Sequence, residues 1–436
     1  MTGERDSVET GGAPDKQPHV RKALSAHSAI GLLAAALLYL VCLTGTLTVF
    51  YEEWQRFEQP DAPEMSSIAP DAVQAAVAAV LASERGQART THLYVHLPVD
   101  ALPRTTVTTD HQAVHVDRNG QVVAPEENAW AEFLLDLHYR LHLPSTLGLT
   151  IVGALGVMIV ALSISGVLAH PRIFRDAFRL RARDAGGVGL ADWHNRLGVW
   201  TLPFTLAIAL TGAMIGLGSV NGYGLAAGFY KGDIEAVYAP IFGGEAKPDL
   251  RPAALPHVAA ALQDIQQRFP DVRPIYVVLH DPMTVGQHVQ IIAEHPFRLI
   301  YGETYDYDAR GRFIGTAGLS DGALGQQLAA STYNLHFGNY GGLSVKIAYA
   351  VFGLALTVIT ATGMSIWLGK RRRRGVDDSR LRAAWRAVVW GVPFALAMCL
   401  TARLVVGNAV ALPVLFWGML GLILLATVAL HRRWEP

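Results

Sequence analysis

The sequence is poor in charge and nearly lacks cysteine. Only 17 % of its 436 residues are charged and 51 % are apolar, whereas soluble domains contain about 25 % charged residues. The formal net charge is zero, so no overall field attracts nucleic acid. The two cysteines, Cys42 and Cys399, lie in apolar runs outside any CxxC or CxxCH pattern, so neither c-type haem nor a cysteine-ligated zinc site is indicated. This composition favours a membrane protein.

Long apolar runs, in contrast, are abundant. A helix needs about 20 apolar residues to cross a bilayer, and six runs qualify: roughly 28–50, 147–169, 196–220, 344–368, 387–407 and 411–430. We therefore predict six transmembrane helices in a lipid bilayer, the last two forming a hairpin. Basic residues cluster before the first run and after the second, fourth and sixth, at Arg21, Lys22, Arg172, Arg175, Arg179, Arg181, Arg183, Lys370, Arg371, Arg372, Arg373, Arg374, Arg432 and Arg433.

Basic loops mark the cytoplasmic side of a membrane protein. The pattern therefore predicts a membrane protein with several spans and both termini in the cytoplasm. The expected segments are a tail (1–26), the first helix (27–50), an outer domain (51–137), the second helix (138–170), a basic loop (171–193), the third helix (194–220), a second outer domain (221–335), the fourth helix (336–369), a basic loop (370–385), a helical hairpin (386–431) and a tail (432–436).

The sequence contains an internal repeat. In the first and third spans a histidine precedes a glycine by four residues and the glycine of a Leu-Thr-Gly motif by eighteen; these are His27, Gly31 and Gly45, and His194, Gly198 and Gly212. The second and fourth spans begin after Leu-His and close with a hydroxyl residue and glycine, although their spacing differs by one; these are His138 and Ser165-Gly166, and His336 and Thr362-Gly363.

The two outer loops also correspond. Each has an Ala-rich, helix-like segment, 71–82 or 253–268, followed by alternating strand-like residues. Asn119-Gly120 is a strong hairpin signal, and a turn ending at Gly311 is its counterpart. The predicted fold is a membrane all-α bundle of six transmembrane helices, with a core four-helix bundle from a tandem repeat and two small α+β extracytoplasmic domains.

Four histidines occupy equivalent helix ends in this repeat. Eighteen residues make five helical turns, so His27 shares a face with Gly45, and His194 with Gly212. Such a face lets a flat macrocycle approach the backbone and be ligated axially. A single histidine at a helix end is more often an interfacial anchor, and glycines alone often serve close packing. Four equivalent histidines, two at each membrane level, favour two haems.

We therefore predict two non-covalent haems per chain. His27 and His194 would hold the iron of the cytoplasmic-side haem, and His138 and His336 that of the outer haem. His142 lies one turn beyond His138 and is the alternative ligand, although only His138 shares the Leu-His context of His336. The pairs His92/His96 and His111/His115 could bind a metal, but surface histidines are the more common interpretation.

No flavin signature, Walker motif or Gly-rich nucleotide loop is present, and the cytoplasmic segments are too short for a reductase domain. The electron donor must therefore be a separate molecule, a quinol or a cytoplasmic flavoprotein.

These motifs resemble the PepSY-associated transmembrane family, which includes iron-regulated inner-membrane proteins and ferric-siderophore reductases. The resemblance covers about 25–370 and rests on motifs in order along four spans: His27…Gly31…Leu43-Thr44-Gly45, Leu137-His138, Asp192-Trp193-His194-Asn195-Arg196-Leu197-Gly198 and Leu335-His336-Phe337-Gly338…Gly341-Gly342. It implies a location in the bacterial inner (plasma) membrane, PepSY-like outer domains, two b-type haems and reduction of siderophore-bound iron in the periplasm. The four histidines match the family's histidine positions, and the hairpin 386–431 lies outside the resemblance.

The leading hypothesis is a redox enzyme that passes electrons between the two haems and reduces a ferric siderophore, releasing ferrous iron. Tyr301, Tyr305 and Tyr307 are candidates for contacting the chelate. The alternative is a non-catalytic PepSY membrane protein that binds a siderophore or a protein in uptake or regulation. A transporter is a third possibility, weakened by the lack of acidic residues within the first four spans.

Overall fold

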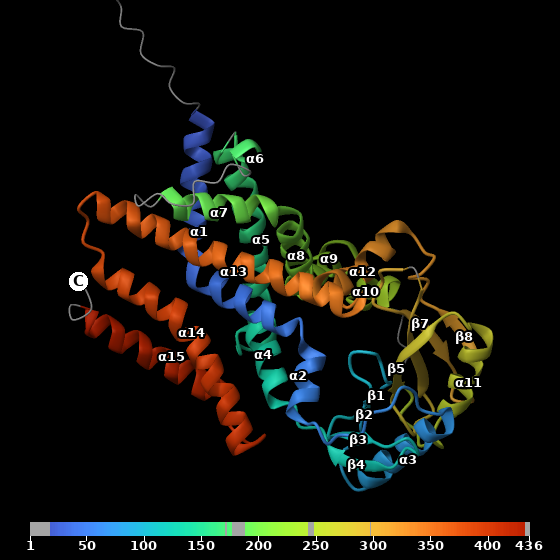
Figure 1. Ribbon diagram of the computed structural model, residues 1–436. Helices are drawn as coiled ribbons and strands as arrows, with labels where there is room; N and C mark the ends of the chain where they lie inside the picture. Colours follow the sequence, from blue (N-terminus) through green and yellow to red (C-terminus); the bar gives the residue numbers. More distant parts are fainter. Residues whose placement is uncertain (1–17, 171, 177–187, 243–247, 297, 432–436) are drawn as a thin grey trace, which may run out of the picture.

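A computed structural model describes residues 18–170, 172–176, 188–242, 248–296 and 298–431. It has two parts, a set of long helices and a β-sheet domain at one end of them (Figure 1). The predicted terminal segments before residue 18 and after residue 431 lie outside the described residues. So do basic residues of the predicted cytoplasmic side, namely Arg179, Arg181, Arg183, Arg432 and Arg433.

Within the described residues, five helices are long and apolar enough to cross a membrane. They are α1 (Pro18–Thr48), α5 (Ser145–Ala169), α13 (Gly342–Arg373), α14 (Ser379–Val406) and α15 (Leu412–Ala429). The predicted third span is a pair of helices, α7 (Val188–Trp200) and α8 (Leu202–Gly216), bent by 68° where they meet. Pro203, near the start of α8, explains the break, because proline cannot continue an α-helix. The prediction of a multi-pass helical membrane protein is confirmed, with six spans if this pair counts as one.

The helix boundaries differ from the prediction at two histidines. His138 and His336 were expected at the start of membrane helices, but they lie on separate shorter helices, α4 (Ala129–Arg140) and α12 (Leu324–Phe337). After α4 the chain turns through left-handed Leu141 and then Pro144, which stop the helix. After α12 the left-handed Gly338 ends the helix before α13 begins.

Two further boundaries move. The predicted tail 1–26 overlaps α1, which is already helical from residue 18, and the predicted basic loop 370–385 shrinks because α13 runs to Arg373 and α14 starts at Ser379. The remaining helices are α2 (Tyr51–Glu58), α6 (Ile173–Asp176), α9 (Gly218–Phe229) and α10 (Glu235–Phe242).

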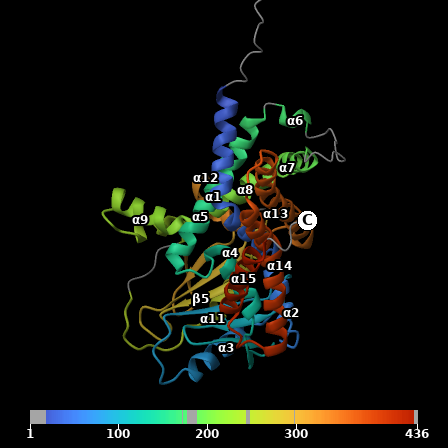
Figure 2. The ribbon, with the colours of Figure 1, turned by 90° about the vertical axis from the view of Figure 1, so that its left-hand side faces the viewer.

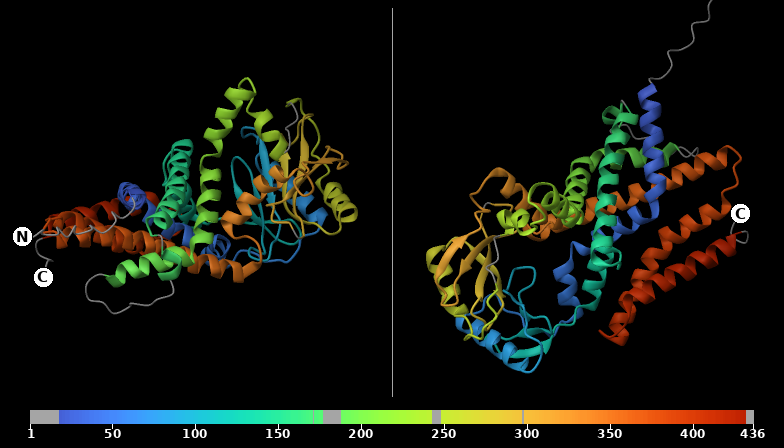
Figure 3. Two further views of the ribbon diagram at one scale, coloured as in Figure 1. Left: turned by 90° about the horizontal axis from the view of Figure 1, so that it is seen from above. Right: turned by 180° about the vertical axis from the view of Figure 1, so that it is seen from behind.

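The long helix α1 is central to the helical part. It contacts α4, α5 and α13, while α5 packs along α8 (Figures 1 and 2). The terminal helices α14 and α15 pack against each other and against α4, as the view from behind in Figure 3 shows. Their shared core is apolar and includes Leu38, Leu137, Leu396 and Phe416, each at most 4 % exposed. The hairpin is thus an integral part of the bundle.

The sheet domain contains eight antiparallel strands. They are β1 (His92–His96), β2 (Thr105–Thr108), β3 (Ala113–Val116), β4 (Val122–Pro125), β5 (Arg273–His280), β6 (His288–Glu294), β7 (Glu303–Tyr307) and β8 (Phe313–Thr316). Their order across the sheet is β4-β3-β2-β1-β5-β6-β7-β8. The predicted hairpins are confirmed as β3–β4 and β7–β8.

Two helices cover one face of this sheet. They are α3 (Pro70–Ser83) and α11 (Val258–Arg268), close to the helices predicted there. Their apolar side chains share one core with every second strand residue, such as Val95 and Val277. The turn glycines Gly120 and Gly311 have positive φ and lie against α3 and α11, where a Cβ would meet helix atoms at 2.0 and 2.6 Å. Glycine is therefore required in both turns.

The sequence predicted two separate outer domains, and the structure corrects this. The four strands of each loop join edge to edge, because β1 pairs with β5 from His92↔His280 to His96↔Tyr276. Each four-strand unit would otherwise leave an unpaired edge strand, and pairing the two edges satisfies these backbone groups. The single sheet also requires both loops to lie at the same end of the helical part.

A buried ion pair fastens the hairpin to α4. Arg403 of α14 donates to a carboxylate oxygen of Glu58 at 2.9 Å, and both side chains are buried. Glu58 also accepts the backbone N–H groups of Trp130 and Ala131, at 2.7 and 2.8 Å, at the start of α4. The hairpin thus helps to fix the helix that carries His138.

Replacing Arg403 by methionine should lower the free energy of unfolding by about 3 kcal/mol, because it leaves the Glu58 carboxylate buried without its counter-charge. Thermal unfolding of the purified protein in detergent would measure the loss. Arg386→Met is the control, since Arg386 is exposed on the same helix. Equal melting temperatures for the two variants would contradict a stabilising role of the pair.

Candidate functional site: two pairs of histidines

The histidine pair nearer the sheet domain, which we term the outer pair, consists of His138 on α4 and His336 on α12. Their ring centres are 6.2 Å apart and their planes are inclined by 24°. Each ring lies over a glycine of another helix: a Cβ on Gly45 of α1 would come within 2.6 Å of His138, and one on Gly212 of α8 within 2.8 Å of His336. Residues from four helices therefore meet at this site.

The inner pair is formed by His27 on α1 and His194 on α7. Their ring centres are 6.3 Å apart and their planes are nearly perpendicular, at 86°. A Cβ on Gly166 of α5 would lie 3.4 Å from His27, and one on Gly363 of α13 would lie 3.4 Å from His194. The structure thus brings together the same two histidine pairs that the sequence pattern predicts.

Each histidine makes the same contacts through its Nδ1 atom. For His27 these are the Leu162 carbonyl at 3.0 Å and the Ser165 hydroxyl at 3.2 Å. For His194 they are the Ile359 carbonyl at 3.1 Å and the Thr362 hydroxyl at 3.0 Å. In both cases the hydroxyl residue is followed by the glycine beneath the ring.

The outer histidines repeat this arrangement. His138 Nδ1 lies 3.0 Å from the Val41 carbonyl and 3.5 Å from the Thr44 hydroxyl. His336 Nδ1 lies 3.0 Å from the Thr211 hydroxyl, with a further backbone hydrogen bond to Ile208. The Leu-Thr-Gly motifs of the sequence therefore hold the outer histidines. We term the carbonyl, the hydroxyl and the glycine that contact one histidine its seat.

These contacts determine the tautomer of each ring. All four hydroxyl groups donate their hydrogen to carbonyls of their own helix, as Thr44 does to Leu40 at 2.9 Å. The hydroxyl oxygens and carbonyls can then only accept from the histidines, so Nδ1 carries the proton. The lone pair of Nε2 is left for another partner. A histidine that ligates a metal usually donates its other ring N–H in this way.

The spacing within each pair suits a single metal ion. Two imidazoles bound to opposite sides of one ion through bonds of about 2 Å would have ring centres roughly 6 Å apart. The measured separations are 6.2 and 6.3 Å. The donor set, neutral imidazole nitrogens without a carboxylate or thiolate, is also one that haem iron accepts. The residues present therefore fit a bis-histidine haem at each level.

The two levels are held apart by one continuous helix. His27 of α1 belongs to the inner site, and Thr44 and Gly45 of the same helix form the seat of His138. Thr44 follows His27 by seventeen positions, which at 1.5 Å per residue corresponds to roughly 25 Å along the axis. The sites therefore lie near opposite ends of the bundle.

Two predicted glycines lie outside these seats. A Cβ on Gly31 would meet only Leu162, at 3.6 Å, and one on Gly198 would meet nothing within 4 Å. The bend between α7 and α8 also separates His194 from Gly212, so the expectation that they share one straight helical face is wrong. A role for Gly31 and Gly198 beside a macrocycle remains a prediction.

His142 does not join the outer pair. Its Nε2 atom lies 3.1 Å from the Phe133 carbonyl, and its ring stacks on the Phe133 ring at 4.9 Å. Left-handed backbone at Leu141 and His142 turns the side chain back toward α4. Between the two candidates, the structure places His138 opposite His336.

The other histidines form no metal centre among the described residues, where no three ligating side chains gather. His111 contacts the Ala88 carbonyl at 2.7 Å, and buried His115 contacts Thr106 and Gln59.

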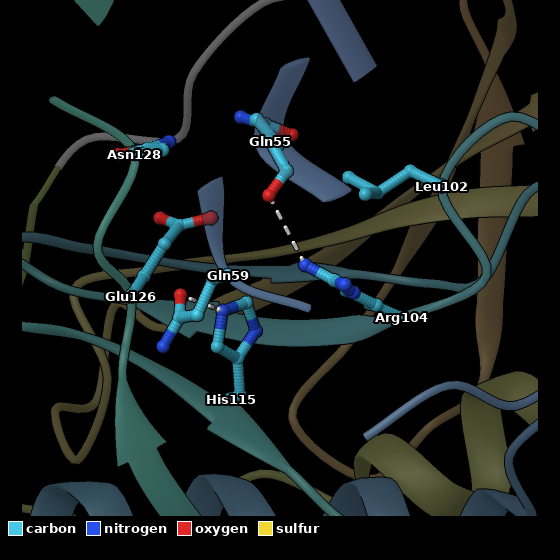
Figure 4. A pocket seen from close by; sticks show the side chains of 7 residues that line it. All are labelled: Gln55, Gln59, Leu102, Arg104, His115, Glu126 and Asn128. Carbon is cyan, nitrogen blue, oxygen red and sulfur yellow. Dashed lines mark hydrogen bonds between the residues drawn. The ribbon is translucent and has the colours of Figure 1, made fainter. Parts of the chain in front are cut away.

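A small polar hollow lies between α2 and the sheet (Figure 4), with a volume of about 190 Å³ if the space open to solvent is counted. It is lined by Gln55, Gln59, Leu102, Arg104, His115, Glu126 and Asn128. Burial raises the pKa of Glu126 to about 7 and lowers that of His115 to about 4. The enclosed space of the hollow is too small for a water molecule, so the hollow is not a cofactor site.

Comparison with known proteins identifies the chain. The model of the PepSY-associated TM region matches residues 24–370. The protein belongs to the PepSY-associated transmembrane family. An uncharacterized protein of Pseudomonas aeruginosa is 27 % identical over 281 residues, which are 58 % of this chain and 67 % of that protein. The matched range includes all four paired histidines of this family member and ends before the α14–α15 hairpin.

The hydroxyl-glycine motifs are visible in the sequence, but their role is not. Ser165-Gly166 and Thr362-Gly363 were interpreted as helix ends, yet they form the seats of His27 and His194. The sequence signal for this role is that each of the four spans contains a serine or threonine followed directly by glycine.

Proposed function

We propose that this protein carries electrons across the bacterial inner membrane on two b-type haems and reduces ferric siderophores at the outer side. The observation that carries the proposal is the fourfold repeated histidine seat. In each seat a carbonyl and a hydroxyl hold the Nδ1 proton, which leaves Nε2 free to ligate, and the two rings of each pair are separated by the distance that a bis-imidazole iron complex requires. Bound haem would supply reversible one-electron chemistry at each pair.

The protein's own residues supply position and environment. The hydroxyl-glycine seats fix the orientation of each imidazole. Because glycine has no side chain, the ring can lie against the backbone. Residues from α1 belong to both levels, which sets the distance that an electron must cross. Hydrogen bonding at Nδ1 also increases the basicity of the ligand, which stabilises the ferric state.

The direction of transfer follows from the orientation. The described basic residues Arg21 and Lys22 begin α1, and Lys370 to Arg373 end α13, at the opposite end from the sheet domain (Figure 1). By the positive-inside rule this end is cytoplasmic. We infer that the sheet domain, formed by two PepSY-like halves of a tandem repeat, faces the periplasm. A quinol or a cytoplasmic flavoprotein would supply electrons at the inner pair.

Siderophores need no cleavage to release iron in this scheme. Hard oxygen ligands bind ferric iron far more tightly than ferrous iron, because they favour the higher charge. One electron is therefore sufficient, and the protein needs no acid–base or nucleophilic residues for the release.

Dithionite-reduced protein should be reoxidised by ferric siderophores and should yield ferrous iron that ferrozine traps. In oriented vesicles the chelate should act only from the side of the sheet domain. If the reduced protein stays reduced with every ferric chelate but is promptly oxidised by a quinone, the function is a quinone-linked relay instead. A purified protein without any haem spectrum would favour the non-catalytic alternative.

A further inference from the structure

A row of aromatic rings leads from the outer histidine pair to the sheet. Successive ring centres are 5.9, 5.8, 6.4, 6.1 and 4.5 Å apart, and the rings belong in order to His336, Phe337, Tyr333, Tyr301, Tyr276 and His96. Tyr276 and Tyr301 are also hydrogen-bonded to each other. Electrons tunnel more readily through packed, conjugated groups than across solvent, so the row connects the outer site with the sheet.

The row ends on the sheet face opposite α3 and α11. We term it the open face because its β1, β5 and β6 part is partly exposed, whereas α2 lies over its β3 part. Strand residues alternate between faces, and the residues between the core positions of β1, β5 and β6 form its centre: Tyr94, His96, Tyr276, Val278, His280, Gln290 and Ile292. Tyr94, beside His96 on β1, is 39 % exposed and gives a solute access to the end of the row. Tyr305 and Tyr307, which the sequence suggested as contacts, are buried in the opposite core.

The charge of the open face limits what can bind there. Within the eight strands that the structure describes, Arg273 is the only lysine or arginine, and Glu294 and Asp100 pair with it at 2.9 and 3.1 Å. Asp306 adds a further carboxylate on this face, hydrogen-bonded to Gln290. Burial lowers the pKa of His96 to about 4, so this histidine is neutral at neutral pH. The face therefore repels anions and accepts neutral or cationic molecules that can contact its aromatic side chains.

We propose that the open face around His96 and Tyr276 is the docking site of the electron acceptor, that it takes ferric chelates of neutral or positive net charge, and that the aromatic row carries the electron to it. This inference rests on the proposed function. One electron passes from the outer histidine site to the chelated iron, which changes from ferric to ferrous. The separate quinol or flavoprotein donor restores it, and no covalent bond forms or breaks.

Binding can be measured apart from reduction. Gallium(III) has the charge and nearly the size of ferric iron but is not reduced by dithionite. The gallium complex of a trihydroxamate with one positive charge should bind the purified full-length protein roughly tenfold more tightly than the gallium complex of a tris-catecholate with three negative charges. Isothermal titration calorimetry would give both affinities. Equal affinities, or tighter binding of the trianion, would overturn the charge assignment.

Two substitutions locate the site. Tyr276→Ser should weaken the cationic gallium chelate about tenfold, whereas Tyr223→Ser, at a 65 % exposed tyrosine of α9, should not change it. Asp306→Lys reverses a charge on the open face and should shift the preference toward the trianion. This gain of binding cannot arise from misfolding. Unchanged affinities in both Tyr276→Ser and Asp306→Lys would place the acceptor elsewhere.

The role of the row requires a different variant. Tyr333 lies on α12 between the outer pair and Tyr301. The substitution Tyr333→Leu should therefore leave gallium-chelate binding unchanged. In stopped flow it should slow the reoxidation of reduced protein by the ferric trihydroxamate severalfold. Wild-type reoxidation rates in this variant would show that the row is not the electron path.

Different results would contradict the proposed function and the proposed docking site. A wild-type protein that is not reoxidised by any ferric chelate contradicts the proposed function itself. A wild-type protein that is reoxidised, with rates and gallium affinities that are insensitive to Tyr276, Asp306 and Tyr333, contradicts only the docking site.

Discussion

His336→Ala should halve the haem content, removing the outer haem and leaving the inner one, and His194→Ala should do the reverse. Each pair lies near its own end of the bundle, and its rings are seated by different helices. The two ligands of one level should behave as a unit, so adding His27→Ala to His194→Ala should cost little further haem. The pyridine haemochrome assay would measure close to two haems per chain in the parent and one in each variant.

The control for this experiment is His142→Ala. His142 lies one turn from His138 but bonds to the Phe133 carbonyl, so its loss should leave both haems in place. The remaining haem in the two single variants should also differ in its electron paramagnetic resonance, because the outer rings are inclined by 24° and the inner rings by 86°. If either single variant loses both haems while remaining folded, the assignment of two independent levels is incorrect.

The second large effect concerns a single added methyl group. Gly45→Ala would place a Cβ 2.6 Å from Cε1 of His138, closer than real Cβ atoms approach a neighbour. The ring is the end of a movable side chain, so it should swing away rather than unfold the bundle. We expect the outer haem to be lost or to become weakly bound, with a nearly unchanged melting temperature for the protein.

Gly212→Ala should have the same result through His336, which its Cβ would approach to 2.8 Å. Gly418→Ala on α15 is the matched control, because it adds a methyl group in a membrane helix with nothing within 4 Å. Haem content and reduced-minus-oxidised spectra distinguish the variants. Full haem occupancy in both Gly45→Ala and Gly212→Ala would rule out the glycine seats as a requirement.

Much of the helical architecture could be predicted because its physical cause is local. Apolar runs of about 20 residues have few alternatives to spanning a bilayer, and turn signals such as Asn119-Gly120 act over a few residues. The positions of the helix breaks were harder to predict from the sequence. Pro203 and Gly338 were visible in the sequence, but helices tolerate such residues when neighbouring groups satisfy the backbone. Only the packing decides which of them bends or ends a helix.

The histidine pairs were predicted because two spans repeat the same spacing. Their seats were not, since the partners of His27 are on α5 and those of His194 on α13, far away in sequence. The aromatic row could not be predicted for the same reason. Tyr276 and Tyr301 lie on one side of the sheet and Tyr305 on the other. The side that each tyrosine occupies depends on strand register, because a shift of one residue moves every side chain of a strand to the opposite face.

The pairing of β1 with β5 has a consequence for how the protein is made. His96 and Tyr276, partners across this seam, are 180 residues apart in the chain. At translation rates of 5 to 20 residues per second, β1 would wait on the order of ten to thirty seconds for its neighbour. In the proposed orientation, the first half has during that time an unpaired strand edge in the periplasm, exposed to any other chain. Periplasmic chaperones should therefore bind the nascent first half, and a separately expressed second half should be able to close the sheet in trans.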